Sequence, residues 1–167
     1  MSVDFIIRSI ADSRELKRLR QFLISQSLWY PDYLRWVDEV CIPDINNSYK
    51  TAIVAYSKGE IVGDAIFQPH KELPRTREFK NLRINPNFRR RDLGHFLIRQ
   101  MEEEQKGSFD RIICDADARL REAIRFMQFC GYSPIMRTQL YCSQNVDVVL
   151  IKELSKSREP YVVGIGN

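Results

Sequence analysis

The sequence predicts an α/β domain with a mixed central sheet of about seven strands flanked by about four helices. Apolar residues alternate in some segments, as in strands, and recur every three or four positions in others, as in helices. The chain has 167 residues, of which 44% are hydrophobic and 29% charged, which suffices for one core. We expect a single domain over residues 1–154 and a C-terminal tail at 155–167.

The first half of the chain predicts a strand, two helices and a hairpin. Asp12 with Glu15 three positions later resembles a capping box, and Pro31 suits the first turn of a helix. Gly59 lies between two β-rich runs, which is a hairpin signal. The expected elements are a strand at 4–10, helices from 12 and from 31, a loop at 41–48, and strands at 51–56 and 60–67.

The second half predicts strands that alternate with helices. Pro86 and an arginine-rich turn precede a helix that Gly107 ends, and Gly131 ends another. The expected elements are a strand at 77–84, a helix up to 107, a strand at 111–114, a helix at 118–130, and strands at 138–142 and 146–154.

Composition excludes several classes of function. No apolar run is long enough to span a membrane, and the N-terminus lacks the features of a signal peptide, so we expect a cytoplasmic protein. A net charge of +4 is too small to indicate a nucleic-acid partner by itself. The cysteines are widely spaced, which argues against a zinc site and favours buried, reduced thiols: Cys41, Cys114, Cys130 and Cys142.

The stretch from 82 to 98 joins the end of a strand, a basic turn and the start of a helix. Free N–H groups at a helix N-terminus bind phosphate groups, and Arg89, Arg90 and Arg91 add positive charge beside them. Gly94 lacks a side chain where a ligand has to approach the backbone. The sequence therefore predicts a turn that holds a pyrophosphate.

This turn resembles the acyl-CoA loop of the GNAT N-acetyltransferase family, Arg/Gln-x-x-Gly-x-Gly/Ala, with residues 89–94 as the matching six. A second segment, 123–132, is similar to the family's Ala-Ile-x-Leu-Tyr-x-x-x-Gly-Phe segment. The resemblance covers about residues 50–154. It implies the GNAT fold, acetyl-CoA as acyl donor, and transfer of the acetyl group to a primary amine.

The resemblance also implies where acetyl-CoA binds. A V-shaped split would separate the strand ending at Ile84 from the strand at 112–114. Pantetheine would pair with the backbone of the first strand, and the pyrophosphate would lie on the turn. The implied cofactor-binding residues are Leu82, Arg83, Ile84, Arg89, Arg90, Arg91, Asp92, Leu93, Gly94 and His95.

Two residues depart from the family pattern. Asp92 replaces a glycine, and its carboxylate would repel a pyrophosphate or cap the helix in its place. Met127 stands where many members have a tyrosine that protonates the departing thiolate, which methionine cannot do, so core packing is its alternative role. Tyr141 and Tyr132 are candidate replacements for that acid, although Tyr132 also fits a core position.

Glu78 is the candidate catalytic base. It lies eleven residues before Arg89, at a position that serves as base in some members that acetylate proteins. The alternative is a surface carboxylate paired with Arg75 or Arg77, and His70 is a second candidate base.

The sequence leaves several readings of function open. The leading one is an acetyl-CoA-dependent N-acetyltransferase whose acceptor is a small molecule or a peptide. In a variant of this reading the acceptor is a charged tRNA, as in GNAT-type toxins. A catalytically degenerate acyl-CoA-binding or interaction module is another, since Asp92 and Met127 fit it. A nucleic-acid binder that uses residues 89–91 has less support, because no binding motif is present. Residues 12–40, rich in aromatics, and 69–77 are expected to set specificity, and edge strands make a homodimer an option.

Overall fold

The computed structural model describes residues 4–26 and 30–154, which fold around a seven-stranded sheet of order β1-β2-β3-β4-β5-β7-β6. Neighbouring strands are antiparallel except for β4 and β5, which are parallel, so the sheet is mixed as predicted. The strands are β1 (Ile6–Ser9), β2 (Thr51–Ser57), β3 (Glu60–Pro69), β4 (Thr76–Ile84), β5 (Arg111–Asp117), β6 (Ser133–Thr138) and β7 (Asp147–Glu153).

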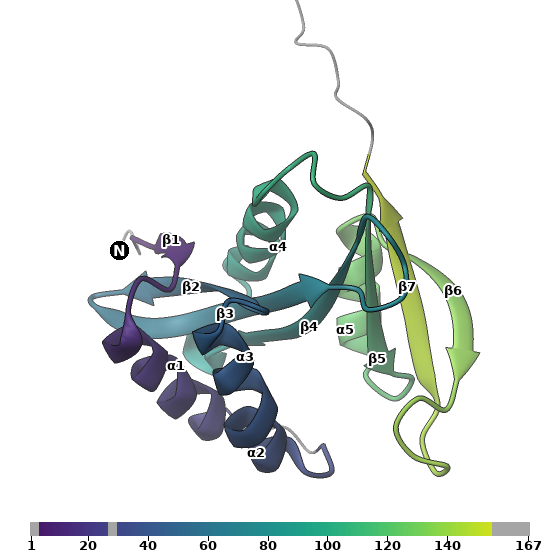
Figure 1. Cartoon of the computed structure of the whole chain (residues 1–167), viewed down its shortest axis with the longest axis horizontal. Helices are drawn as coiled ribbons and strands as arrows, with labels where there is room; N and C mark the ends of the chain where they lie inside the picture. The colour runs from purple at the N-terminus through teal and green to yellow at the C-terminus, as the bar shows by residue number, and fades with distance from the viewer. Residues whose placement is uncertain (1–3, 27–29, 155–167) are drawn as a thin grey trace, which may run out of the picture.

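Helices cover both faces of the sheet. On one face of β1–β4 lie α1 and the α2–η1–α3 segment, and α4 lies on the opposite face (Figure 1). A separate cluster of buried apolar side chains fills each layer. The helices are α1 (Ser13–Ser25), α2 (Tyr33–Trp36), the π-helical turn η1 (Val37–Cys41), α3 (Ile42–Asn46), the 3-10 turn η2 (Pro86–Phe88), α4 (Leu93–Glu103) and α5 (Arg121–Phe129).

Helix α1 forms as its sequence predicts. The Asp12 carboxylate accepts a hydrogen bond from the Glu15 N–H at 2.8 Å, which satisfies one of the free donors of the first turn. Residues at helical spacing then turn one face of the helix to the sheet, and their burial holds it there: Leu16, Leu19, Phe22 and Leu23.

Four expected elements are wrong in type, position or length. The helix expected to end at Gly107 ends at Glu103 instead, because the backbone of Glu104 is extended. The expected loop at 41–48 is largely helical, because Pro43 lies in the first turn of α3, where its missing N–H is tolerated. The helix expected at 118–130 starts only at Arg121, since the Asp117 carboxylate holds the Arg119 N–H in a turn. The strand expected at 138–142 is instead β6, which starts directly after the turn that ends α5.

Strands β4 and β5 separate after a short paired stretch. Thr76–Phe79 pairs with Arg111–Cys114, and beyond it each strand keeps a neighbour on one side only. Lys80 is an extra residue in β4, because Phe67 faces Phe79 while Ile66 faces Asn81. Such a bulge bends its strand, and β4 and β5 diverge from their paired ends (Figure 1). The split expected from the sequence is therefore present.

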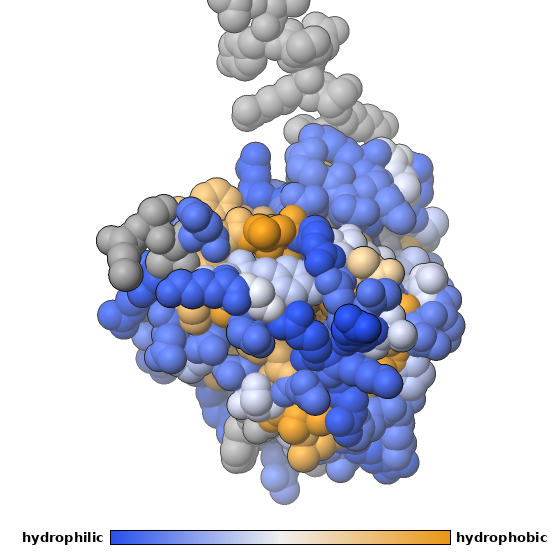
Figure 2. Space-filling view, turned by 90° about the vertical axis from the view of Figure 1, so that its left-hand side faces the viewer, coloured by the Kyte–Doolittle hydropathy of each residue, from blue (hydrophilic) through white to orange (hydrophobic). Residues whose placement is uncertain are grey.

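Cys41, Cys114 and Cys130 are buried free thiols, as predicted, whereas the free thiol of Cys142 is only partly buried. Among residues 4–26 and 30–154, no helix has the length and apolar character needed to cross a membrane. Figure 2 shows the face on the β1 side as mostly hydrophilic, with hydrophobic residues in small separate patches. The expected tail at 155–167 lies outside the described residues, so a domain boundary at 154 stays a prediction.

Candidate active site

The turn between β4 and α4 presents a helix N-terminus beside the split. The first hydrogen bond of α4 runs from the Phe96 N–H to the Asp92 carbonyl at 3.0 Å. The N–H groups of Leu93, Gly94 and His95 therefore have no acceptor within the helix, and no described side chain caps them. Free donors with the positive end of a helix dipole form a site suited to a phosphate group.

Asp92 occupies a backbone conformation that favours glycine. Its φ is +58°, in the left-handed region, and Arg90 has a φ of +59°. The Asp92 side chain makes no capping hydrogen bond, so the possibility that it occupies the helix N-terminus in place of a phosphate is wrong. Its carboxylate remains exposed beside the turn.

The three arginines of the turn are exposed around this helix N-terminus. The Arg89 Nε donates to the Ile84 carbonyl at 3.1 Å, which holds the turn against the end of β4. The Arg91 guanidinium lies 5.7 Å from the centre of the Phe88 ring. None of the three arginines pairs with a carboxylate among the described residues, so their charges are available to an anion at the turn.

Gly94 has a different role from the one expected. A Cβ atom there would lie 3.0 Å from Ile84 Cδ1 and 3.0 Å from Phe126 Cζ. Glycine therefore suits the close packing of α4 against the end of β4 and against α5, where an added Cβ would force Ile84 or Phe126 to shift by a few tenths of an ångström. The expectation that Gly94 makes room for a ligand is wrong, because its missing side chain points into the protein.

The last residues of β4 offer an open strand edge to the split. The Leu82 and Ile84 side chains pack against the core below α4, whereas the Arg83 guanidinium lies 5.7 Å from the Tyr33 ring on the opposite face. From Lys80 to Ile84 this strand pairs only with β3. An extended ligand with amide groups can pair with such an edge, as an added strand does.

Glu78 lies on β4 just before the split and is largely buried, with 20% of its side chain exposed. It forms an ion pair with Lys80 at 2.8 Å and accepts a hydrogen bond from Gln68 Nε2 at 2.7 Å. Burial acts to raise the pKa of Glu78, but the Lys80 pair and the Gln68 hydrogen bond outweigh it and lower that pKa. The carboxylate is thus stabilised in its ionised form, which weakens it as a base.

The expected partners of Glu78 have other roles. Arg75 pairs with Asp110 at 2.7 Å. The buried Arg77 donates to the carbonyls of Met101 and Glu104 and lies between two aromatic rings, so it ties the end of α4 to the sheet.

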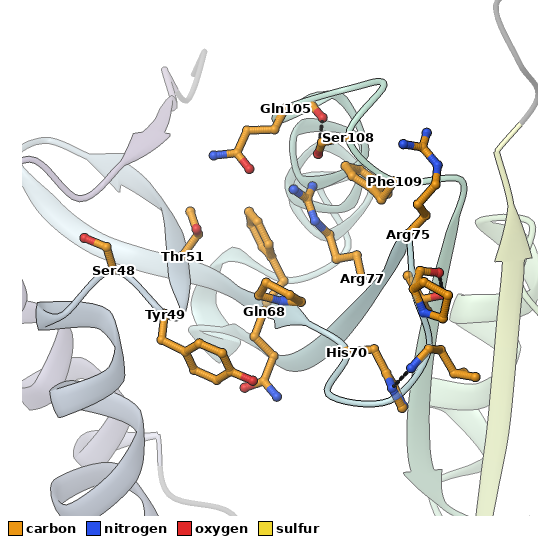
Figure 3. Close-up of a pocket in the computed structure, with 15 residues that line it drawn as sticks. Ser48, Tyr49, Thr51, Gln68, His70, Arg75, Arg77, Gln105, Ser108 and Phe109 are labelled. Atoms are coloured by element: carbon orange, nitrogen blue, oxygen red, sulfur yellow. Dashed lines mark hydrogen bonds between the residues drawn. The ribbon is translucent and has the colours of Figure 1, made fainter.

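A hollow of about 360 Å³ lies at the start of β4 (Figure 3), and no residue of the 89–94 turn lines it. Gln68 belongs to its wall and donates to Glu78, so the hollow adjoins the start of the split. His70 lies in the same wall, and its Nδ1 accepts N–H hydrogen bonds from Glu72 and Leu73 at 3.1 and 3.0 Å. With Nδ1 held in the loop, His70 is a weaker candidate base than its position in the sequence suggests.

The structure adds Asp115, which the sequence analysis missed, to the candidate site. Tyr141, in the loop between β6 and β7, donates its hydroxyl to Asp115 Oδ1 at 3.0 Å. The Tyr30 ring contacts the Tyr141 ring edge-on, with 5.6 Å between the ring centres. We call these three residues, together with Glu78 and Lys80 of β4, the acceptor-side cluster: Tyr30, Glu78, Lys80, Asp115 and Tyr141.

Met127 and Tyr132 lie in the core, whereas His95 is only partly buried. Met127 is 6% exposed and Tyr132 is 2% exposed, and both belong to the apolar cluster below α4. The core-packing alternative is therefore confirmed for Met127, and the same burial removes Tyr132 as a proton donor at the split. The His95 side chain lies against the Phe129 ring and Cys130, away from the acceptor-side cluster.

A mixed sheet that splits between two parallel strands, with a free helix N-terminus after the first, is the arrangement that the resemblance to the GNAT family implies. The sequence model described as the acetyltransferase (GNAT) family matches residues 16–132, which is more than half of the chain. The chain therefore belongs to the GNAT acetyltransferase family.

Solved structures show the same fold. The ribosomal-protein-S18-alanine N-acetyltransferase from Escherichia coli has a TM-score of 0.74 at 15% identity, covering 93% of this chain and 97% of its own. An aminoglycoside 6'-N-acetyltransferase complexed with coenzyme A has a TM-score of 0.73 at 16% identity, covering 92% and 99%. NAA60 from Arabidopsis thaliana, in complex with a bisubstrate analogue, has a TM-score of 0.68 at 13% identity, covering 92% and 100%. A comparison with curated protein sequences found no significant match.

Proposed function

We propose that this chain transfers an acetyl group from acetyl-CoA to a primary amine in the split between β4 and β5. The observation that carries the proposal is the free N-terminus of α4 directly after the open edge of β4. One ligand would have to offer both an extended amide chain and phosphate groups to use both features. Coenzyme A has this chemistry, and one structural neighbour is a complex with it.

The residues present fit that ligand. Backbone groups of Leu82, Arg83 and Ile84 would pair with the pantetheine amides, and the N–H groups of residues 93–95 would bind the pyrophosphate. Arg89, Arg90 and Arg91 would supply charge-assisted hydrogen bonds to the phosphates. These three positive charges exceed the single negative charge of Asp92, so the turn stays attractive to anions.

Acetyl transfer from the thioester to the amine needs little from the protein beyond holding the two reactants in position. The amine nitrogen attacks the thioester carbonyl carbon, a C–N bond forms, the C–S bond breaks, and its electron pair goes to sulfur. Holding the two reactants together supplies much of the rate, and N–H groups at the β4 edge would polarise the carbonyl. Tyr141, at the split, is the remaining candidate donor of a proton to the thiolate. Partial burial of its hydroxyl and the negative charge of Asp115 raise the pKa of Tyr141, so it stays protonated at neutral pH.

The acceptor belongs to a class rather than to one molecule. The two neighbours named for their acceptors act on a protein alanine and on an aminoglycoside, and both are amines. We therefore extend the proposal to an amine acceptor in a small molecule or a peptide, used in the cytoplasm. A charged tRNA and a non-catalytic binding module remain the competing proposals.

Turnover decides between catalysis and a binding module. The assay measures release of the CoA thiol from acetyl-CoA, with mass spectrometry of the acceptor, across an alanine-first peptide, an aminoglycoside, a polyamine and an aminoacyl-tRNA. Acetylation of any primary amine above the uncatalysed rate supports the proposal. Binding of acetyl-CoA without acetylation of any acceptor would favour the degenerate module instead.

A further inference from the structure

Asp115 lies at the point where the split begins. Cys114 is the last residue of β5 that pairs with β4, opposite Phe79, and Asp115 is the next residue along. The Cys114 side chain is buried in the core below α4, so Asp115 points to the opposite face. Glu78 pairs with Ile113 and shares that face, which brings both carboxylates to one side of the split.

The surroundings of Asp115 suit a positively charged amine. Tyr141 occupies its Oδ1, whereas Oδ2 accepts no hydrogen bond from any described residue. The rings of Tyr141 and Tyr30 lie beside it, and aromatic rings with a carboxylate attract an ammonium group. Two further charged side chains act on Asp115: the negative charge of Asp147 on β7 and the positive charge of Lys80 on β4.

Asp115 differs from Glu78 in both its contacts and its proton affinity. Lys80 and Gln68 occupy the two oxygens of Glu78 and hold its pKa low. Burial raises the pKa of Asp115, and the charges of Asp147 and Glu78 raise it further, while Lys80 and the Tyr141 hydroxyl act against them. A carboxylate whose pKa is raised from its ordinary value and that keeps a free oxygen is suited to accept a proton.

We propose that Asp115 binds the ammonium group of the acceptor and takes the two protons that its nitrogen loses, one before the attack and one after it. This inference rests on the proposed function and gives the site a second, acceptor-side half. The ammonium group first loses one proton through Asp115 Oδ2 to solvent, and the neutral nitrogen then bonds to the thioester carbon. Its second proton passes to Asp115 Oδ2 as the C–S bond breaks, and the departing thiolate is protonated from solvent or by Tyr141. Glu78 is then a positioning residue that holds Lys80 at the bulge.

Two measurements test this on the full chain. Carboxyl-carbon NMR follows the titration of Asp115 and Glu78 in the wild type, with assignments from the D115N and E78Q variants. The pH profile of kcat/KM, with the fastest amine of the panel, is then compared between wild type, D115N and D117N. D117N is the matched control, because Asp117 lies two residues further along β5 and already pairs with Arg119.

We expect Asp115 to titrate at a higher pH than Glu78, and D115N to lower kcat/KM by about 100-fold and to abolish the acidic limb of the profile. D117N should keep that limb and stay within about threefold of wild type. An Asp115 that titrates below Glu78, or a D115N variant that retains the acidic limb, overturns the inference and leaves the proposed function intact. If no amine is acetylated, the proposed function is wrong. The NMR titration still measures whether Asp115 titrates at a higher pH than Glu78.

Discussion

Replacing Asp64 with asparagine should stabilise the protein at neutral pH and change its stability little near pH 4. Asp64 lies on β3, below the α2–η1–α3 segment, and is fully buried. Asn81 donates to its Oδ2 at 2.8 Å, and its Oδ1 has no hydrogen-bond partner among the described residues. Burial therefore raises the pKa of Asp64 from 3.8 to about 7, although Asn81 and the charge of Arg83 oppose the change.

The sign of the effect follows from proton binding. Between pH 4 and 7 the folded protein holds a proton on Asp64 that the unfolded chain releases. The free energy of unfolding then falls by about 1.4 kcal/mol for each pH unit of increase. From the ordinary pKa of 3.8 to about 7 the total loss is on the order of 4 kcal/mol, and it levels off above pH 7. Asparagine keeps an oxygen for Asn81 and never ionises, so the variant avoids this loss.

Urea unfolding of wild type and D64N at several pH values from 4.5 to about 8 measures the effect. The difference between the two proteins removes the contributions of other titrating groups that they share. We expect the variant's advantage to grow with pH and to reach a plateau above about pH 7. A difference that does not change with pH would refute the reasoning, because it would mean that folding does not raise the pKa of Asp64.

Three further substitutions test the site and its surroundings. D92G should tighten acetyl-CoA binding in calorimetry, since it removes a negative charge beside the phosphates and no helix cap is lost; equal or weaker binding would show that the carboxylate is directed elsewhere. M127A should lower the free energy of unfolding by about 2–4 kcal/mol but retain kcat in the folded variant, whereas a catalytic role would show as lost turnover. G94A should destabilise by about 1–2 kcal/mol, because its Cβ would lie 3.0 Å from Ile84 and from Phe126, and an unchanged Tm would argue against that packing.

The sequence predicted those parts of the fold that depend on interactions between residues close together in the chain. The Asp12 cap and the helical spacing of Leu16 and Leu19 define α1, because both act within a few residues. The basic turn of residues 89–94 was readable for the same reason. Strand β6 was misplaced, since two neighbouring segments have strand-forming residues, and pairing with β7 selects the first of them.

The acceptor-side cluster depends on contacts between distant segments. Asp115 reaches the split only through the register that pairs Thr76 with Arg111, which no local pattern specifies. The sequence analysis named Arg75 or Arg77 as the partner of Glu78, and the structure gives Lys80 instead, at a bulge that no local pattern predicts. A charged residue within the apolar strand around Cys114 was the one signal in the sequence that pointed to Asp115.

Calorimetric titration with acetyl-CoA tests the central claim, that the split and the α4 N-terminus form an acyl-CoA site. The comparison is between wild type, the double variant R89A/R91A, and the control R14A/K17A, which removes two exposed positive charges from α1 on the other face of the sheet. We predict micromolar binding that R89A/R91A weakens at least about tenfold and the control leaves unchanged. Absence of binding, or equal weakening in both variants, would contradict the assignment of the site.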